Sequence, residues 1–454
     1  MGMDVRRLAA VVVVAAVTVL AVQLGGVSGN LVFKVENKFR IGGKERTLSA
    51  LKAHDDRRRG RILSSVDLPL GGNGQPSETG LYFAKIGLGI PSKDYYVQVD
   101  TGSDILWVNC AGCSKCPTKS DLGIELTLFD PAKSEKVGCN DDYCISTYDG
   151  ELSGCKSGID CQYSVTYGDG SSTSGFFVKD YVQLEQATGN LQTGKLNTSI
   201  IFGCGVNQSG DLGSSSYSAV DGILGFGQAN SSMLSQLAAA GKVKKEFAHC
   251  LDAVKGGGMF AIGDVVSPIV STTPLVPNMP HYNVNLKAVE VGGDVLQQLP
   301  TDLFETGGQR GTIIDSGTTL AYLPSDLFEP MMAKILDRQQ GLQLHTVEDQ
   351  FSCFKFSQNI DDGFPPVKFH FENSLTLTVY PHEYLFLIHN GGVQSHDGKQ
   401  TILLGDLVLS GKLVVYDMEN QTIGWTEYNC SSSIKIKDEK SRAVYSIGAH
   451  DISG

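Results

Sequence analysis

At 454 residues, with 41% hydrophobic and 19% charged residues, the chain is long enough for two substantial cores and too apolar to be disordered. Its formal net charge of −12 leaves no broad cationic surface for phosphate groups, so we expect no nucleic-acid binding. The 53 glycines, together with many short runs of β-branched and aromatic residues, favour strands joined by tight turns and a mostly β fold.

The first 29 residues have the features of a secretory signal peptide. An apolar run, Leu8 to Leu24, follows two arginines, and the small residues Val27 and Gly29 come next at the spacing that signal peptidase accepts. A membrane anchor is the alternative, but the run is short for a membrane span and gives way to Gly and Ser. We therefore expect cleavage and no stable membrane anchor afterwards.

Residues 30–78 are predicted to form a prosegment and linker. The basic cluster Arg57-Arg58-Arg59-Gly60-Arg61 precedes an acidic body, and its cations would lie against carboxylates until acid protonates them. This pattern suggests self-inhibition, and a disordered N-terminal linker is the alternative. A Gly/Pro/Ser-rich hinge over 71–77 comes before the first clear strand, at 81–86.

One order of elements occurs twice in the body of the chain. In the first copy an apolar strand leads into Asp100-Thr101-Gly102-Ser103, and Ile223-Leu224-Gly225 follows later. In the second copy an apolar strand leads into Asp315-Ser316-Gly317-Thr318, and Leu403-Leu404-Gly405 follows later. The repeat predicts two similar lobes.

Each copy places a carboxylate on a tight turn, where glycine lets the backbone approach and amides can bond the carboxylate. A single Asp-Ser-Gly is usually an ordinary turn, but two copies with apolar-apolar-Gly partners indicate a functional pair. If two such carboxyls met at hydrogen-bond distance, they could not both ionise cheaply, so Asp100 and Asp315 would then share one proton and titrate together.

The chain resembles the pepsin-like aspartic proteases, and in particular their plant nepenthesin- and nucellin-like group, over about residues 81–430. The motifs that carry the resemblance are the stretches 99–108, 167–171, 221–225, 314–319, 403–406 and 424–425. The resemblance implies an all-β, bilobal acid protease fold with two β-barrel-like lobes and a central substrate cleft. It also implies polypeptide substrates and a monomer. The predicted domains are a signal peptide (1–29), a prosegment and linker (30–78), an N-terminal catalytic lobe (79–270), a C-terminal catalytic lobe (271–431) and a polar tail (432–454).

The resemblance assigns catalysis to Asp100 and Asp315. A water molecule between them would lose a proton to the ionised carboxyl and attack a peptide carbonyl polarised by the protonated one, with no metal or other cofactor. The same resemblance implies active-site support from Thr101, Gly102, Ser103, Ser316, Gly317 and Thr318. In this arrangement Thr101 and Ser316 bond across the lobe boundary, while Ser103 and Thr318 bond the outer carboxylate oxygens.

The resemblance further places Tyr167 on a hairpin whose turn includes Gly168 and which closes over substrate as a flap. Tyr167 is expected to hydrogen-bond Trp107. A packed hairpin aromatic is the alternative for Tyr167, and the surrounding motif makes it the weaker one.

Eleven cysteines behind a signal peptide indicate disulfide bonds. Cys110, Cys113 and Cys116 superficially resemble a zinc site, but no His-x-x-x-His pattern accompanies them, so we expect no metal. The resemblance implies the pairs Cys110–Cys113, Cys116–Cys204, Cys139–Cys161, Cys144–Cys155 and Cys250–Cys430. It leaves Cys353, whose partner in relatives would lie within 384–392, where this sequence has no cysteine.

Asn-x-Ser/Thr triplets fit a glycosylated protein of the secretory pathway, and they begin at Asn197, Asn207, Asn230, Asn420 and Asn429. We expect the extracellular space or the cell wall, with the vacuole as the alternative compartment. The last residues, 446–454, are too polar for the signal that is exchanged for a lipid anchor.

Motifs of serine hydrolases, zinc proteases and P-loop proteins are absent from the sequence. The scattered histidines, such as His249 and His370, are expected to be core or surface residues. The competing hypothesis is a non-catalytic binding or inhibitor protein of the same fold. Such proteins characteristically lose a catalytic Asp or the flap, whereas Asp100, Asp315 and Tyr167 are all present, so the enzyme is favoured. The natural substrate and the prosegment cleavage site stay open.

Overall fold

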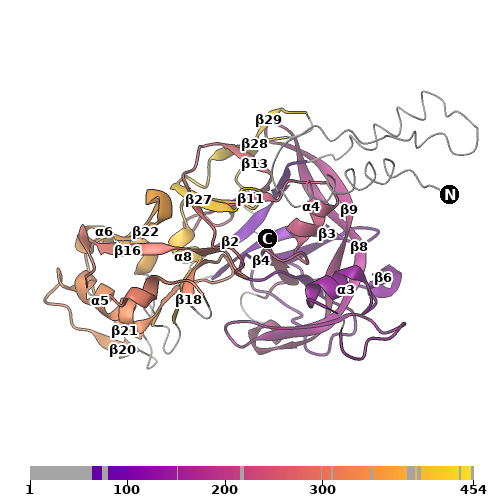
Figure 1. Cartoon of the computed structure of the whole chain (residues 1–454), viewed down its shortest axis with the longest axis horizontal. Coiled ribbons are helices and arrows are strands. Elements are labelled where there is room, and N and C mark those ends of the chain that lie inside the picture. The colour runs from indigo at the N-terminus through magenta and orange to yellow at the C-terminus, as the bar shows by residue number, and fades with distance from the viewer. Residues whose placement is uncertain are drawn as a thin grey trace, which may run out of the picture. The chain divides into compact units, whose positions relative to one another are not determined.

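The computed structural model describes residues 64–450 apart from short gaps, which are residues 74–79, 151, 215–218, 298, 308–309, 348–350, 386–393, 396–399 and 439–440. The predicted signal peptide and the basic cluster therefore lie outside the described residues. The described part is an all-β, pepsin-like fold with few short helices, as expected (Figure 1).

The largest sheet runs through most of the molecule. Its strands, in the order in which they lie side by side, are β14 (Thr272–Pro274), β27 (Thr422–Glu427), β26 (Lys412–Asp417), β11 (Glu246–Leu251), β12 (Gly258–Ile262), β1 (Val66–Leu68), β8 (Ser172–Gly189), β9 (Gln192–Ser209), β5 (Leu106–Asn109), β10 (Gly222–Gly225), β4 (Lys93–Asp100), β3 (Leu81–Leu88) and β2 (Leu70–Asn73). β6 (Glu135–Lys136) and β7 (Gln162–Thr166) also pair with β8. Because β14, β26 and β27 come from the predicted C-terminal lobe, one continuous sheet joins the two halves of the chain.

The remaining strands form four smaller sheets. The first contains, in sheet order, β13 (Asp264–Ser267), β28 (Ser433–Lys437) and β29 (Val444–Gly448), and the second contains β15 (Asn283–Val284), β18 (Arg310–Ile314), β25 (Gln400–Leu404), β19 (Ala321–Leu323) and β24 (Gln394–Ser395). The third contains β17 (Asp294–Val295), β16 (Leu286–Val291), β22 (Val367–Phe371) and β23 (Thr376–Val379). The fourth pairs β20 (His345–Val347) with β21 (Phe351–Cys353). The helical segments are η1 (Pro131–Lys133), α3 (Asp142–Thr147), η2 (Gly210–Gly213), α4 (Met233–Ala239), η3 (Thr301–Phe304), α5 (Ser325–Leu336), α6 (Ile360–Gly363), η4 (Glu372–Ser374), α7 (Pro381–Tyr384) and α8 (Asp406–Leu409).

The sequence repeat corresponds to a repeated arrangement of strands. β4, which ends at Asp100, pairs in parallel with β10, and β10 pairs antiparallel with β5. In the second half β18, which ends one residue before Asp315, pairs in parallel with β25, and β25 pairs antiparallel with β19. The apolar-apolar-Gly strands, β10 and β25, are therefore the central strands of two equivalent units, and each fixes the strand that carries an Asp.

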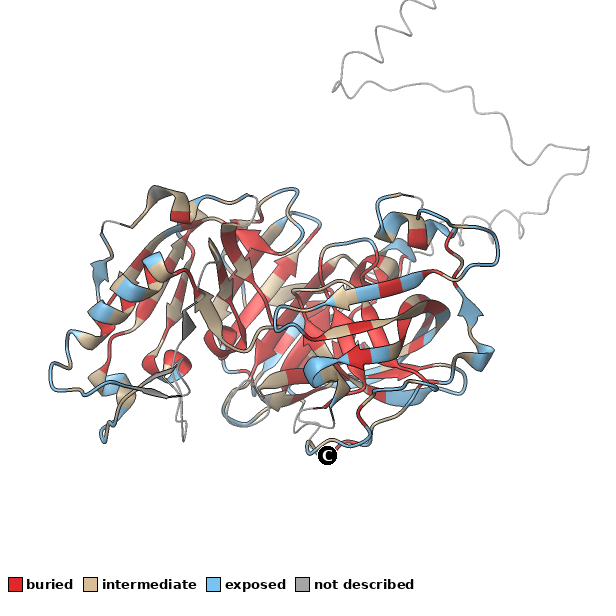
Figure 2. Ribbon diagram, turned by 90° about the horizontal axis from the view of Figure 1, so that it is seen from below, coloured by how far each residue is buried: buried red, intermediate tan, exposed pale blue. Residues whose placement is uncertain are grey.

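Burial follows the alternation in the sequence. In β22 the buried residues are every second one, and in the central strand β10 all four residues are buried. Helix α5 buries Leu327, Met331 and Ile335, which recur every fourth residue on one face of the helix. Figure 2 shows the buried residues gathered in the interior, between the strands.

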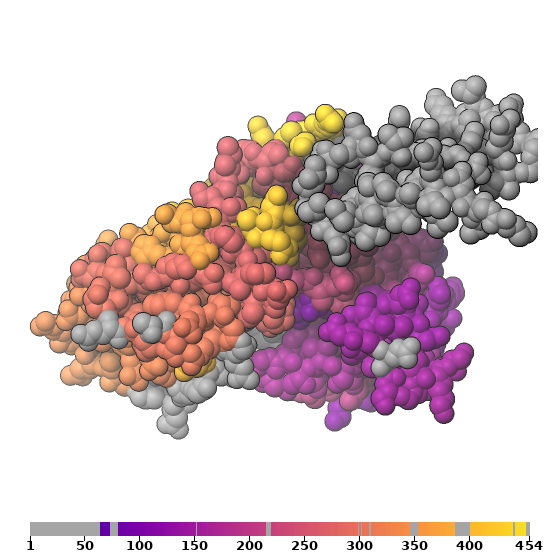
Figure 3. Space-filling view, viewed as in Figure 1, coloured from indigo at the N-terminus to yellow at the C-terminus, as the bar shows by residue number. Residues whose placement is uncertain are grey.

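The expected boundaries at the two ends of the body need correction. Residues 66–73 were assigned to the linker, but they form β1 and β2, and β1 pairs with both β12 and β8. Residues 432–454 were assigned to a polar tail, but 433–437 and 444–448 form a hairpin that pairs with β13 (Figure 1). In the space-filling view the yellow residues toward the C-terminus lie against the body of the molecule (Figure 3). The sequence Ser-Ile-Lys-Ile-Lys over 433–437 alternates with a period of two, and its two isoleucines, Ile434 and Ile436, are buried.

Four of the five expected disulfide pairs are wrong, and Cys250–Cys430 is confirmed. The structure has Cys110–Cys204, Cys113–Cys116, Cys139–Cys155 and Cys144–Cys161 in place of the other four. Strand pairing explains the Cys110–Cys204 bond. β5 runs in parallel beside β9 with Val108 opposite Cys204, so Cys110, two residues after Val108, lies near Cys204. The disulfide interpretation of the Cys110, Cys113 and Cys116 cluster holds, because all three sulfur atoms are in disulfides.

Cys353 lies at the end of β21, opposite His345 of β20. The segment in which relatives would carry its partner falls mostly outside the described residues. Along the part of the chain that the structure describes, no helix combines the length and the apolar composition needed to cross a membrane.

Candidate active site

The two Asp loops bind their own carboxylates in the same way. Asp100 Oδ1 accepts a hydrogen bond from Gly102 N at 2.8 Å, and its Oδ2 accepts one from Ser103 Oγ. Asp315 Oδ1 accepts one from Gly317 N at 2.8 Å, and its Oδ2 accepts one from Thr318 Oγ1 at 2.6 Å. The predicted contacts of Ser103 and Thr318 with the outer oxygens are therefore present, and each carboxylate is fixed at both oxygens.

The structure brings the two carboxyls into contact. The side chains of Asp100 and Asp315 lie against each other, and both residues are buried, with 6% and 9% of their surface exposed. The two glycines make room for this contact. A methyl group on Gly102 would lie against the carboxyl of Asp315, and one on Gly317 would lie against the carboxyl of Asp100. Glycine at both positions is thus a requirement of the pair.

Bonds between the two loops hold them in register. Ser316 N donates to Thr101 Oγ1 at 2.8 Å, and Ser316 Oγ donates to the carbonyl of Val99 at 3.4 Å. Gln98 adds a bond from its Nε2 to the carbonyl of Gly317 at 3.4 Å. Thr101 and Ser316 are both buried, so the expected bonds across the lobe boundary are made away from solvent.

Burial and charge favour a shared proton in the pair. Burial raises the pKa of Asp100 above its usual range, and the negative charge of Asp315 raises it further, while the bonds from Ser103 and Gly102 act in the opposite direction. One negative charge on the pair is therefore far less costly than two.

Asp406, which the sequence analysis did not single out, adds a third acidic group. It begins helix α8 directly after Gly405 and is buried, and among the described residues its Oδ1 has no hydrogen-bond partner. Burial, together with the charges of Asp315 and Asp100, raises its pKa well above the usual range. The signal in the sequence was the acidic residue immediately after Leu403-Leu404-Gly405.

Tyr167 lies at the turn between β7 and β8, as expected for a flap. Tyr167 N donates to the carbonyl of Ser171 at 2.9 Å, and Asp169 Oδ1 accepts from Ser171 N at 2.9 Å, which closes the turn. Gly168 is in the same turn, and a side chain there would meet open space. The hairpin turn is thus held by its own short-range bonds.

The flap tyrosine is connected to the carboxyl pair. Trp107 Nε1 donates to Tyr167 Oη at 2.7 Å, so the predicted bond is present. Tyr167 also lies beside the side chain of Ser103, whose hydroxyl bonds Asp100. Burial and the charge of Asp100 raise the pKa of Tyr167 above its usual value, so its hydroxyl keeps its proton and remains a donor.

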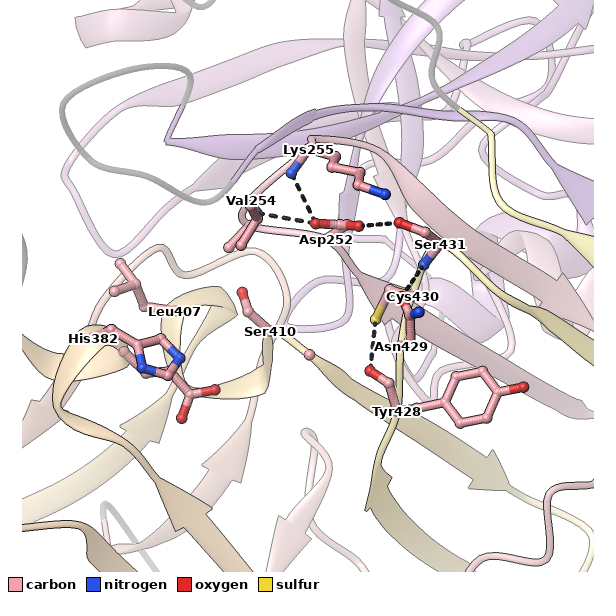
Figure 4. A pocket seen from close by; sticks show the side chains of 13 residues that line it. Asp252, Val254, Lys255, His382, Leu407, Ser410, Tyr428, Asn429, Cys430 and Ser431 are labelled. Atoms are coloured by element: carbon pink, nitrogen blue, oxygen red, sulfur yellow. Dashed lines mark hydrogen bonds between the residues drawn. The ribbon is translucent and has the colours of Figure 1, made fainter. Parts of the chain in front are cut away.

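A separate cavity of about 280 Å³ lies near the Cys250–Cys430 disulfide (Figure 4). Its polar groups are engaged with one another, since Asp252 accepts from Lys255 N at 2.9 Å and from Ser431 Oγ at 2.8 Å. None of the predicted catalytic or flap residues lines it. Among the described residues no group of three or more His, Cys, Asp or Glu side chains could hold a metal ion.

Two equivalent β units that each contribute an Asp-Thr/Ser-Gly loop to one carboxyl pair define a pepsin-like protein. Two family models match this chain: the one described as xylanase inhibitor N-terminal covers residues 82–264, and the one described as xylanase inhibitor C-terminal covers residues 281–427.

The relatives are consistent with this class. Aspartic proteinase 36 of Arabidopsis thaliana is 54% identical to this chain, over 99% of this chain and 93% of that protein. Aspartic proteinase 39 of the same plant is 51% identical, over 99% and 94%. The chain therefore belongs to the aspartic proteinase family, as the sequence predicted, and is an enzyme of that class. The crystal structure of edgp shares the fold, with a TM-score of 0.64 at 18% sequence identity over 81% of this chain and 95% of that chain.

Proposed function

We propose that the protein is an aspartic endopeptidase that hydrolyses peptide bonds with a water molecule activated between Asp100 and Asp315. The observation that supports this most strongly is the contact of the two buried carboxyls, each held by a matching set of donors. The substrates are polypeptides.

The chemistry requires one ionised and one protonated carboxyl. The ionised member accepts a proton from water while the water oxygen bonds to the carbonyl carbon, and the protonated member gives its proton to the carbonyl oxygen. The resulting tetrahedral gem-diol breaks its C–N bond as the carboxyl that took the water proton passes it to the nitrogen, while the other carboxyl, now ionised, takes a proton from a hydroxyl of the diol. The two carboxyls end the cycle with one proton between them, so the pair is regenerated.

The flap excludes water from this reaction. Tyr167 is held by the bond from Trp107 on β5, and it lies beside Ser103 of the loop that carries Asp100. A substrate lying under the hairpin would thus be desolvated next to the carboxyls.

The apolar run at the N-terminus and the basic cluster before residue 64 support synthesis as a secreted, inactive precursor. We assign the mature enzyme to the extracellular space or the cell wall, as a glycosylated monomer. The vacuole is the alternative compartment for a chain that enters the secretory pathway.

A non-catalytic binding protein is the second candidate, because the matching family models are described as those of xylanase inhibitors. Such a role does not require a matched pair of buried carboxyls or the glycines that let them meet. The intact pair therefore favours catalysis.

The experiment measures hydrolysis of an unfolded protein at acidic pH by the processed enzyme. Asp100→Asn and Asp315→Asn should each lower the rate roughly 10²–10⁴-fold, and pepstatin should inhibit the wild type. Asp94→Asn, at an acidic side chain that is 63% exposed, is the matched control and should be fully active. Unchanged cleavage by the Asp100 and Asp315 variants would reject the mechanism, and an inactive processed wild type would favour the binding protein.

A further inference from the structure

A buried histidine and tyrosine lie next to each other beneath the catalytic loops. His249 is on β11 and Tyr416 is on the neighbouring strand β26, and neither side chain is exposed to solvent. His249 Nε2 and Tyr416 Oη are 3.1 Å apart, within hydrogen-bond distance. The sequence analysis expected His249 to be a core or surface residue, and its contact with Tyr416 gives it a specific partner.

The ring of Tyr416 is fixed by aromatic neighbours. It stacks on Phe247 with ring centroids 4.2 Å apart and an angle of 8° between the planes. It also meets Tyr282 edge to face, at 4.7 Å and 68°. Packing of this kind leaves the ring little freedom, so the position of its hydroxyl is set by the core.

The hydroxyl of Tyr416 also reaches the catalytic loops. It lies beside the side chain of Thr101, whose Oγ1 accepts from Ser316 N at 2.8 Å. Thr101 directly follows Asp100, and Ser316 directly follows Asp315. One series of polar contacts therefore runs from His249 through Tyr416 to the point where the two loops are joined.

The direction of these bonds follows from His249. Burial lowers the pKa of His249 to about 3, so the ring is neutral at mildly acidic pH, and within the described residues its Nδ1 has no partner. A buried N–H without an acceptor is rarer than an acceptor without a donor, so the proton belongs on Nε2. His249 Nε2–H then donates to Tyr416 Oη, which leaves the hydroxyl proton of Tyr416 available to the neighbouring Thr101 Oγ1.

We propose that Tyr416, oriented by His249, is a positioning residue of the catalytic pair that fixes Thr101 Oγ1 between the loops and directs a bond dipole toward the carboxyls. This inference rests on the proposed peptidase function. The titratable groups that face Tyr416 are Asp315 and Asp406, with His249 and Tyr282 packed beside it. The positive end of the hydroxyl dipole favours the singly ionised pair.

The test is Tyr416→Phe, which keeps the packed ring and removes the hydroxyl. We expect kcat to fall roughly fivefold, as the loss of one buried hydrogen bond predicts, with KM within about twofold of the wild type. Because ionisation of the pair becomes harder, the acidic limb of the pH profile should move to higher pH by about 0.3–0.5 units.

The matched control is Tyr384→Phe. Tyr384 is also buried, and its hydroxyl donates to the carbonyl of Pro365 at 2.7 Å, without contact with the catalytic loops. Tyr384→Phe should lower the melting temperature about as much as Tyr416→Phe, and it should leave kcat and the pH profile unchanged. If Tyr416→Phe behaves like this control, the proposal is wrong.

A second pair of variants, at His249, tests the proposal if Tyr416→Phe does not fold. His249→Gln keeps an N–H donor and should retain the wild-type pH profile, whereas His249→Leu should shift the acidic limb in the same direction as Tyr416→Phe. Identical profiles for His249→Leu and the wild type would overturn the proposal. An inactive wild type would contradict the proposed function, while an active wild type with unaffected variants would contradict only the role of Tyr416.

Discussion

Gly102 and Asp315 face each other so closely that a methyl group on Gly102 would lie 2.6 Å from Asp315 Oδ1. The converse contact, between a methyl group on Gly317 and Asp100, would be closer still. Each loop therefore limits how near the other carboxyl can come, and the separation of the pair depends on two glycines that take no part in the chemistry.

Gly102→Ala should reduce kcat/KM about 100-fold, because a shift of the order of 1 Å in a reacting group is enough for such a loss. The enzyme should still fold, since the added methyl meets a side chain rather than the backbone. Gly341→Ala is the control, because a methyl group there meets nothing within 4 Å. Full activity of Gly102→Ala in a peptide assay would show that the carboxyls need not touch.

Tyr167→Phe should lower kcat/KM roughly tenfold by removing the hydroxyl that accepts the bond from Trp107 and lies beside Ser103. Its thermal stability should change little, because the ring remains packed. Tyr148→Phe removes a hydroxyl that donates to the carbonyl of Gln162, at the base of the same hairpin, and should leave kcat/KM unchanged. Equal effects of the two changes would mean that Tyr167 acts only through packing.

Asp406→Asn should make the stability of the protein less dependent on pH. The pKa of Asp406 is raised in the folded state, so its contribution to stability is present below about pH 4, the usual range of an Asp carboxyl, and is lost as the pH rises. The free energy of unfolding of the variant should therefore exceed that of the wild type by a margin that grows toward neutral pH. Denaturant unfolding across pH 4–7 measures this margin, and Asp94→Asn should show none.

Ile436→Ala should destabilise the protein by about 2–5 kcal/mol, the usual cost of such a truncation in a core. Ile436 lies on β28, is fully buried and packs with the Cys250–Cys430 disulfide in one apolar cluster. Lys435→Ala, at the neighbouring exposed position of the same strand, should change the free energy of unfolding by less than about 0.5 kcal/mol. Similar values for both variants would mean that the C-terminal hairpin contributes nothing to the fold.

The sequence was most informative where one short pattern occurs twice. Asp100 and Asp315 could be paired because each follows an apolar strand and has its own apolar-apolar-Gly partner, and both features are local. Disulfide pairing failed because the choice among Cys110, Cys113 and Cys116 depends on which strand lies beside β9, and spacing along the chain does not contain that information. The position of Tyr416 could not be predicted for the same reason, because its contact with Thr101 joins residues more than 300 positions apart.

If the protein is made as the precursor proposed above, the position of β1 restricts where it can be cleaved. Residues 66–68 lie between β12 and β8, in the middle of the largest sheet, and every side chain of the strand is buried. A protease that cut beyond residue 68 would strip backbone partners from both neighbouring strands and open the sheet from within. A cut after Arg61 leaves only Ile62 and Leu63 ahead of Ser64, so the basic cluster marks nearly the last place at which the chain can be shortened without loss of a structural strand.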